Sequence, residues 1–161
     1  MVEEIKQILL RFGLMLALIF GLFWFLKHST RVNISANDKS MNEVSFPEGG
    51  YSVNTALEKI TDLKKGDVVA YSLTGDAANR HVARVVGVEG QRVAIAPGNI
   101  SVDGAPFGFK VELEKTTIAE FKVPRGCAYL LADIPANGSD SLKNGPIPFL
   151  NILGTIKPVK P

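Results

Sequence analysis

Apolar residues recur at every second position over much of the stretch from residue 66 to residue 102, which is typical of β-strands. The alternating runs are residues 68–73, 81–86, 92–96 and 100–102. Because a period of two places alternate side chains on opposite faces of a sheet, His81 and Ala83 are expected to face the same way. The pair Asp103-Gly104 follows the last run, and an Asp-Gly pair next to apolar runs predicts a tight hairpin.

The pattern beyond this stretch adds short strands and little helix. Further alternating or apolar runs predict strands at residues 31–34, 109–113, 117–123, 128–132 and 152–156. Residues 54–62 have the spacing of a short amphipathic helix, with Asn54 or Thr55 as its N-cap. Loops are expected at 46–50, which holds proline and paired glycines, and at 133–141, which is rich in small polar residues. The sequence therefore predicts a mostly β domain.

Residues 8–26 break the pattern, because they are apolar all around a helix apart from Arg11. A helix of this length spans roughly 28 Å, close to the hydrocarbon thickness of a bilayer. The apolar circumference disfavours a core helix, and residues 27–31, KHSTR, replace the small residues of a signal-peptide cleavage site. We therefore predict an N-terminal tail at 1–7, an uncleaved transmembrane anchor at 8–26 and a β domain at 27–161. Basic residues flank the span on both sides, so charge does not fix its orientation.

Charge, cysteine and histidine content exclude several classes of function. The formal net charge is +2 and no basic stripe with interleaved aromatic residues is present, so nucleic acid is not an expected partner. Cys127 is the only cysteine and lies in an apolar run, which excludes an internal disulfide and favours a packing role. His28 and His81 are the only histidines, so a multi-histidine metal site is not expected.

Several segments, taken in order, carry a family resemblance. They are Ser40-Met41 after the anchor, 66–71 (GDVVAY), 81–87 (HVARVVG), 100–104 (ISVDG), and 123–126 (VPRG) followed by 133–146. Together with the anchor they resemble the type I signal peptidases, which are membrane-anchored serine endopeptidases with a Ser–Lys dyad. No single motif is specific, but the order and the spacing are kept over nearly the whole chain.

The resemblance implies a signal-peptidase-like antiparallel β domain with one N-terminal transmembrane helix. It implies cleavage of signal or leader peptides from exported preproteins or pilin precursors, without a metal or another cofactor. The expected partners are the signal peptide of such a precursor and the lipid bilayer. The expected location is the inner (plasma) membrane, as a single-pass protein with its β domain on the extracytoplasmic side.

By the same resemblance, Ser40 is the nucleophile and its backbone N–H contributes to the oxyanion hole. The supporting or substrate-binding residues that the resemblance implies are Met41, Asp133, Ser139, Asp140 and Ser141. The general base of the family is a lysine directly before an arginine, and here Ala83 holds that place before Arg84. The other departures are Glu43 for a proline, Ala132-Asp133-Ile134-Pro135 for G-D-N-R, and Leu142 for a closing arginine. A shift of one residue places Gly138, instead of Ser139, at the family's last hydroxyl position.

Ala83 cannot accept the proton of a serine hydroxyl, so three interpretations stay open. In the first, His81 replaces the lysine as the general base, because it lies about 6.6 Å from Ala83 on the same face of the strand. An exposed strand residue is nevertheless the commoner role for such a histidine. In the second, Ala83 is an introduced substitution that traps an inactive enzyme. In the third, the chain is a natural pseudoenzyme that binds a preprotein or pilin without cutting it and assists pilus assembly. Lys39, next to Ser40, is a poor base because neighbours in an extended segment point apart.

A function of another class is also open, namely an anchored β domain that only scaffolds a secretion complex. Under that interpretation Ser40 and residues 137–141 lie far apart in the fold. Under the signal peptidase interpretation they lie close together, and this difference is a direct test of the two.

Overall fold

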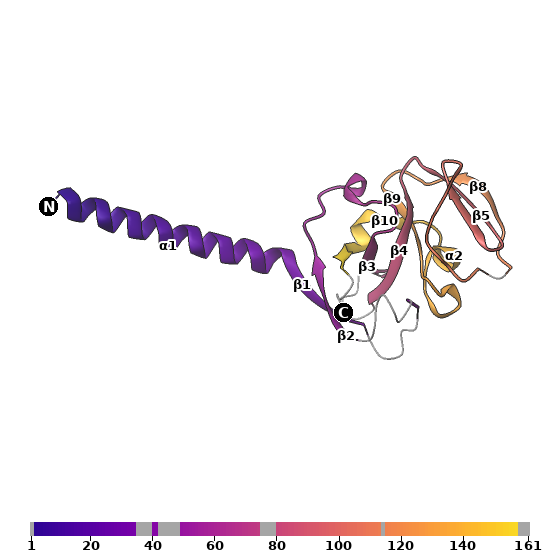
Figure 1. Ribbon diagram of the computed structural model, residues 1–161, viewed down its shortest axis with the longest axis horizontal. Coiled ribbons are helices and arrows are strands. Elements are labelled where there is room, and N and C mark those ends of the chain that lie inside the picture. Colours follow the sequence, from indigo (N-terminus) through magenta and orange to yellow (C-terminus); the bar gives the residue numbers. More distant parts are fainter. Residues whose placement is uncertain (1, 35–39, 42–48, 75–79, 114, 158–161) are drawn as a thin grey trace.

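The apolar N-terminal segment forms one continuous helix, α1 (Val2–His28), which projects from the β-rich remainder of the chain (Figure 1). The structure is a computed structural model that describes residues 2–34, 40–41, 49–74, 80–113 and 115–157. Within α1, the side chains from Glu3 to Leu26 are exposed, and an 18-residue window of this segment has a mean hydropathy of 2.2. By length and composition it is able to cross a membrane, in agreement with the predicted anchor, although the helix begins several residues earlier.

Lys39, Glu43 and residues 46–48 of the predicted loop lie outside the described residues. The remaining two residues of that loop, Gly49 and Gly50, are the first residues of a strand, so the loop prediction is wrong there.

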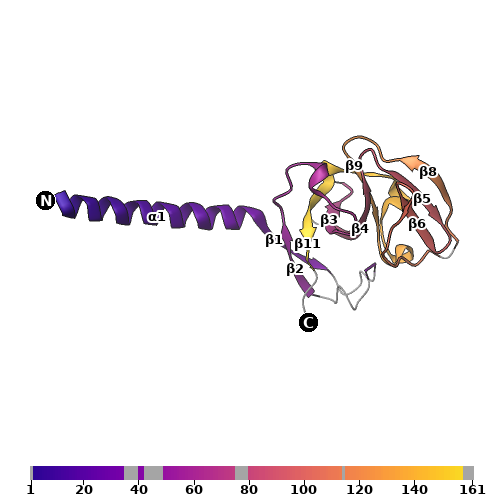
Figure 2. The ribbon, with the colours of Figure 1, turned by 45° about the horizontal axis from the view of Figure 1, so that its top comes forward.

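The described strands form two antiparallel sheets. The larger sheet has the order β1 (Ser29–Ile34), β2 (Gly49–Asn54), β11 (Ile152–Ile156), β3 (Val68–Ser72), β4 (Arg80–Val88), β9 (Cys127–Leu131) and β10 (Ile147–Pro148). The smaller sheet has the order β7 (Ala105–Pro106), β6 (Asn99–Val102), β5 (Arg92–Ala96) and β8 (Ile118–Lys122), and it lies at the end of the molecule away from α1 (Figure 2).

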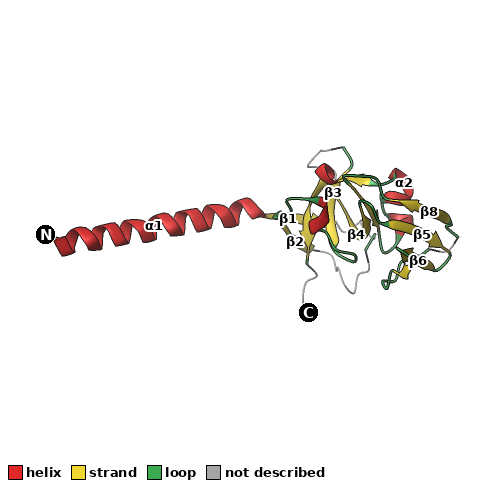
Figure 3. Cartoon of the chain, turned by 90° about the horizontal axis from the view of Figure 1, so that it is seen from above, coloured by secondary structure: helices red, strands yellow, loops and turns green. Residues whose placement is uncertain are grey.

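Helix is a minor component of the domain. The short helical segments between the strands are η1 (Ile60–Asp62), η2 (Pro135–Asn137), α2 (Ser141–Asn144) and η3 (Phe149–Asn151) (Figure 3). The mostly β, antiparallel architecture with an N-terminal apolar helix confirms the predicted fold class.

Strand β4 is the longest described strand and links the two sheets, because a turn at Glu89-Gly90 leads directly into β5. Its pairing with β3 places Ala83 opposite Val69 and His81 opposite Tyr71. On its other side β4 pairs with β9, with Arg84 opposite Leu131 and an irregularity between Val85 and Gly87.

The two faces of β4 enter different parts of the core. Val82 packs in a cluster with Met41, Val68 and Ala70, whereas Ala83 and Val85 pack on the other side with Leu130 and other apolar residues. The residues of β4 between Val82 and Gly87 are buried apart from Arg84, which is half-buried. Close packing on both faces therefore makes β3, β4 and β9 a rigid support for the segments that contact them.

The hairpin predicted at Asp103-Gly104 is present and joins β6 to β7. Asp103 has φ = 50° and Gly104 has φ = 78°, so both central residues are left-handed, as a type I′ turn requires. The Asp103 carboxylate also accepts a hydrogen bond from the backbone N–H of Arg92 at 2.8 Å, which ties the turn to the start of β5.

The helix predicted at 54–62 is wrong. Asn54 ends β2, and only η1 is helical within this segment. The Asn54 side chain accepts from the N–H of Ala56, and one Asp62 oxygen accepts from the N–H groups of Glu58 and Lys59. The two Asp62 bonds compete with helical hydrogen bonds for the N–H groups of Glu58 and Lys59, whereas the Asn54 bond is one that an N-cap would also make.

The strand predicted at 109–113 is also wrong, because the backbone groups of this segment bond elsewhere. The N–H of Glu112 donates to the carbonyl of Asp133 at 2.9 Å, and the carbonyl of Leu113 accepts from Gly98 at 3.2 Å. Phe109 within this segment packs beside Phe107, with the two ring centroids 5.2 Å apart. The segment therefore lies across the ends of other elements instead of extending a sheet.

Candidate active site

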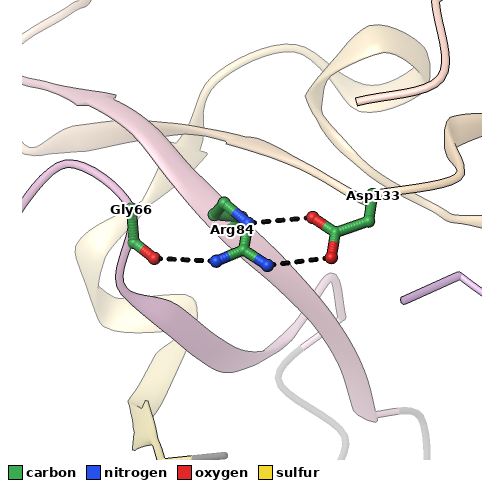
Figure 4. A network of polar contacts seen from close by, with 3 residues as sticks. All are labelled: Gly66, Arg84 and Asp133. Atoms are coloured by element: carbon green, nitrogen blue, oxygen red, sulfur yellow. Dashed lines mark hydrogen bonds and ion pairs between the residues drawn. The ribbon is translucent and has the colours of Figure 1, made fainter. Parts of the chain in front are cut away.

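A buried ion pair fixes the segment that follows β9. The Arg84 guanidinium on β4 donates to both carboxylate oxygens of Asp133, with two N–O distances of 2.8 Å (Figure 4). Its third nitrogen donates to the carbonyl of Gly66 at 3.1 Å, and the Phe109 ring lies 4.9 Å from the guanidinium carbon. The two charged side chains are only 11% and 6% exposed, so the pair holds β3, β4 and the end of β9 together.

Residues 138–144 return to β9 through two further buried side chains. The Asp140 carboxylate accepts from the N–H of Ala132 and from the N–H of Leu142, both at 3.1 Å, and it caps the first turn of α2. The Ser141 hydroxyl oxygen accepts from the N–H of Leu130 at 2.9 Å. Both residues therefore act through the backbone, and they position the preceding Gly138 and Ser139.

Ser40 lies against this returning segment. Its side chain is 2% exposed, and its carbonyl accepts a hydrogen bond from the N–H of Ile134 at 2.9 Å. A methyl group built on Gly138 would lie 3.6 Å from the Cβ of Ser40. The structure thus brings Ser40 and the 137–141 segment together, which is the arrangement that the scaffold-only interpretation did not expect.

Ala83, the residue predicted to hold the place of the family's lysine, lies on the strand next to β9. Continuing the β4–β9 register by one step places Ala83 across from Ala132, and a methyl on Gly138 would lie 2.6 Å from the Cβ of Ala132. Ala83 itself is fully buried and packs with Val69 and other apolar side chains. Ser40, Gly138, Ala132 and Ala83 therefore form a continuous row, without an ionisable group at position 83.

His81 lies farther along the same face of β4, beside Tyr71. The two rings have centroids 5.6 Å apart, and the Tyr71 hydroxyl donates to the carbonyl of Ser139 at 2.8 Å. Tyr71 is 1% exposed, whereas His81 is half-buried. A series of contacts thus leads from His81 through Tyr71 to Ser139, whose neighbour Gly138 adjoins Ser40.

Met41 points away from this row and into the core. It is 2% exposed and belongs to the cluster that includes Val32, Tyr51 and Ile156. The burial of Met41 anchors the short described segment that carries Ser40.

Burial changes the ionisation of two groups behind the row. It raises the pKa of the Asp140 carboxyl above its ordinary value; the N–H groups of Ala132 and Leu142 and the nearby Lys143 ammonium oppose the rise without cancelling it. Burial, with a smaller contribution from the Asp140 carboxylate, raises the pKa of Tyr129 to about 12. Burial therefore disfavours the charged forms of these two groups.

The order of these elements along the chain matches a known family. The sequence fits the family model described as "Signal peptidase, peptidase S26" over residues 5–159, which is nearly its full length. The chain belongs to the signal peptidase family. Among solved structures it is similar to a signal peptidase I from Enterococcus faecalis V583, with 17% identity, a TM-score of 0.47, and coverage of 58% of this chain and 95% of that chain. A comparison with curated proteins finds no match.

Membership in the signal peptidase family implies a serine peptidase, which is a hydrolase, and it confirms the resemblance found in the sequence. The roles of Ser40, His81 and the position held by Ala83 stay predictions, as do those of Met41, Asp133, Ser139, Asp140 and Ser141. Within the described residues, no cluster of three or more histidine, cysteine, aspartate or glutamate side chains could hold a metal ion.

Two contributors to the site were missed by sequence reasoning. Tyr71 was assigned only to a strand face, although its place opposite His81 could have been inferred once β3 and β4 were paired. Ala132 was noted only as a departure from the family motif, and no sequence signal shows that its methyl lies beside Gly138. Both depend on tertiary contacts between segments far apart in the chain.

Proposed function

We propose that this protein is a membrane-anchored serine endopeptidase of the signal peptidase type, with Ser40 as its nucleophile. The proposed substrates are the signal or leader peptides of exported preproteins or pilin precursors. The observation that carries the proposal is the burial of Ser40 beside Gly138, next to the sheet that carries Ala83 and His81. Family membership supports the class of reaction.

The proton of the Ser40 hydroxyl needs an acceptor, and His81 is the proposed one. A neutral imidazole accepts a proton near neutral pH, whereas the methyl of Ala83 cannot. The position of His81 beside Tyr71, which reaches Ser139, supports this role. An extended substrate would bind by adding a strand next to Ser40, with main-chain hydrogen bonds supplying most of the affinity.

Cleavage of a fluorogenic signal-sequence peptide by the full chain in detergent tests this function. We expect cleavage by the unaltered chain that is lost in both Ser40→Ala and His81→Ala. Ser101→Ala, on the smaller sheet, and His28→Ala, at the end of α1, are the matched controls and should leave the rate unchanged. Cleavage that survives Ser40→Ala would overturn the proposal.

A second candidate is a signal-peptidase-like protein that binds such a peptide without cutting it, as an assembly factor for a pilus or secretion machine. The fully buried, apolar surroundings of Ala83 favour it, because they contain no proton acceptor at the family's base position. In the same assay this candidate predicts peptide binding without cleavage by the unaltered chain, and cleavage only after Ala83→Lys.

The proposed location is the inner membrane, with α1 as a single span and the β domain on the extracytoplasmic side. Leu150 is 94% exposed and lies far from Ser40 in sequence, so a Leu150→Cys variant in a Cys127→Ala background gives a single accessible thiol. We expect this thiol to react with a membrane-impermeant maleimide in intact spheroplasts. Reaction only after membrane disruption would place the domain in the cytoplasm.

A further inference from the structure

The backbone conformation of Gly138 does not require a glycine, so the reason for a glycine at this position lies elsewhere. Its φ of −95° and ψ of 163° are extended values that any residue adopts. The obstacle is space, because a methyl on Gly138 would lie 2.6 Å from the Cβ of Ala132, well inside van der Waals contact. At this point the fold therefore has room for one Cβ, and Ala132 supplies it.

Ala132 is in turn held firmly in place. It is fully buried directly after β9, its N–H donates to the Asp140 carboxylate, and the next residue is clamped by Arg84. The Ala132 methyl is therefore unable to move, and a side-chain atom added to Gly138 would displace the backbone around residue 138 instead.

The same missing side chain sets the position of Ser40. The Cβ of Ser40 lies 3.6 Å from the place where a methyl on Gly138 would sit, which is ordinary van der Waals contact. Ser40 is further tied to this corner by the bond from the N–H of Ile134, two residues beyond Ala132. A displacement of the 138 segment would therefore move it against Ser40.

We infer that Ala132 and Gly138 are a size-matched pair of positioning residues for Ser40. The Ala132 methyl fills the room that a side chain at 138 would need, and the Cβ of Ser40 borders the same room. This inference rests on the proposed function for its catalytic meaning, but the geometry of the pair can be measured without any cleavage.

A double-variant cycle tests the pair. Gly138→Ala adds the excluded methyl, Ala132→Gly removes the one that blocks it, and the double variant keeps one Cβ at this point. Ala128→Gly combined with Gly138→Ala is the matched control, because Ala128 is a fully buried alanine on the same face of β9, four residues earlier. Both double variants have the same composition, so only the place of the removed methyl differs.

The first measurement is hydrogen exchange of the Ile134 amide in the full chain in detergent, since this N–H bonds to Ser40. We expect Gly138→Ala to speed exchange by about tenfold or more, the usual scale of an overpacking defect. We expect Ala132→Gly with Gly138→Ala to return to within roughly threefold of the unaltered chain, and the Ala128 control to stay fast. If Gly138→Ala does not fold, recovery of folded protein by Ala132→Gly, and not by Ala128→Gly, is the same test.

The second measurement is the labelling rate of Ser40 by a fluorophosphonate, corrected for the folded fraction, with Ser40→Ala as the blank. We expect it to follow the same pattern as Ile134 exchange. Unchanged Ile134 exchange in Gly138→Ala, or equal rescue by Ala128→Gly, overturns the inference about the pair. If the unaltered chain neither cleaves the peptide nor is labelled, but the exchange results are as expected, the proposed function is overturned. The inference about Ala132 and Gly138 then still holds.

Discussion

The two faces of β4 beside the Ser40 corner differ in what they hold. One face keeps a charged group, Arg84, in a two-bond ion pair with Asp133. The other presents Ala83, a methyl group packed among apolar side chains. Consecutive residues of one strand thus combine a partnered charge with a position where the sequence resemblance led us to expect a lysine base. The comparison distinguishes the residues that stabilise the fold, such as Arg84 and Asp133, from the residues proposed to transfer a proton. Substitutions can change either set without changing the other.

Removing the partner of Arg84 should have the largest effect. Asp133→Ala leaves a guanidinium that is 11% exposed without its carboxylate, and we expect a loss of about 3–5 kcal/mol in the free energy of unfolding. Chemical denaturation of the full chain in detergent measures it. The control is Glu120→Ala, whose partner Arg92 is 3.9 Å away in an exposed pair and whose loss should stay within about 1 kcal/mol. Equal effects of the two variants would show that the buried pair does not hold the frame.

The next effect concerns the tie between α2 and β9. Ser141→Ala removes the acceptor of the buried Leu130 N–H, and we expect a loss of about 1–3 kcal/mol. The Leu130 amide should also exchange faster with solvent. Ser141→Thr keeps the hydroxyl oxygen and is the conservative control for the hydrogen bond. Unchanged protection of Leu130 in Ser141→Ala would contradict this role.

A smaller effect is expected at Tyr71. Tyr71→Phe keeps the ring beside His81 and removes the hydrogen bond to the Ser139 carbonyl, at a cost of about 0.5–1.5 kcal/mol. If the contacts from His81 to Ser139 orient the proposed base, the same variant should also shift the pH profile of cleavage. The matched control is Tyr129→Phe, whose ring packs with Phe121 in another cluster. A stability loss without any change in the pH profile would reduce Tyr71 to a packing role.

The smallest expected effect is the pH dependence that Asp140 contributes. Since its pKa is raised in the folded chain, its share of the stability is fully present below the unfolded pKa of about 3.9 and is lost as pH rises through the folded pKa. The difference in stability between the unaltered chain and Asp140→Asn should therefore change over that interval and be flat at higher pH. Denaturation at a series of pH values measures it, and a difference that favours the carboxylate as pH rises would show the opposite shift.

The strands of the central stretch could be predicted because their signal is local. Alternation over 92–96 matches β5 residue for residue, and Asp103-Gly104 is a turn whose geometry follows from its two residue types. The helix predicted at 54–62 failed because the Asp62 side chain takes the N–H groups of Glu58 and Lys59, which a helix starting at Asn54 would use for its own hydrogen bonds. Periodicity describes the faces of a segment and does not report such local competition.

The site could be predicted only in part. Ser40 and Asp133 were predicted through the order of family motifs; the structure bonds Ser40 to Ile134, next to Asp133, and their roles stay predictions. The contact between Ala132 and Gly138 could not be predicted from the sequence, because it depends on the distance between two small residues in the folded chain. A motif records which residue types occur, whereas the size of a gap depends on the packed fold.

The place of β11 has a consequence for how the protein is made. This last described strand pairs with both β2 and β3, so the hairpin next to α1 joins the rest of the larger sheet through the C-terminal end of the chain. During synthesis, α1 and the β1–β2 hairpin leave the ribosome long before β11 does. The larger sheet can therefore be completed only after residues 152–156 have been synthesised, when α1 is already available to the membrane. A chain that stops before Ile152 would keep its anchor and most of its strands, yet could not close the sheet.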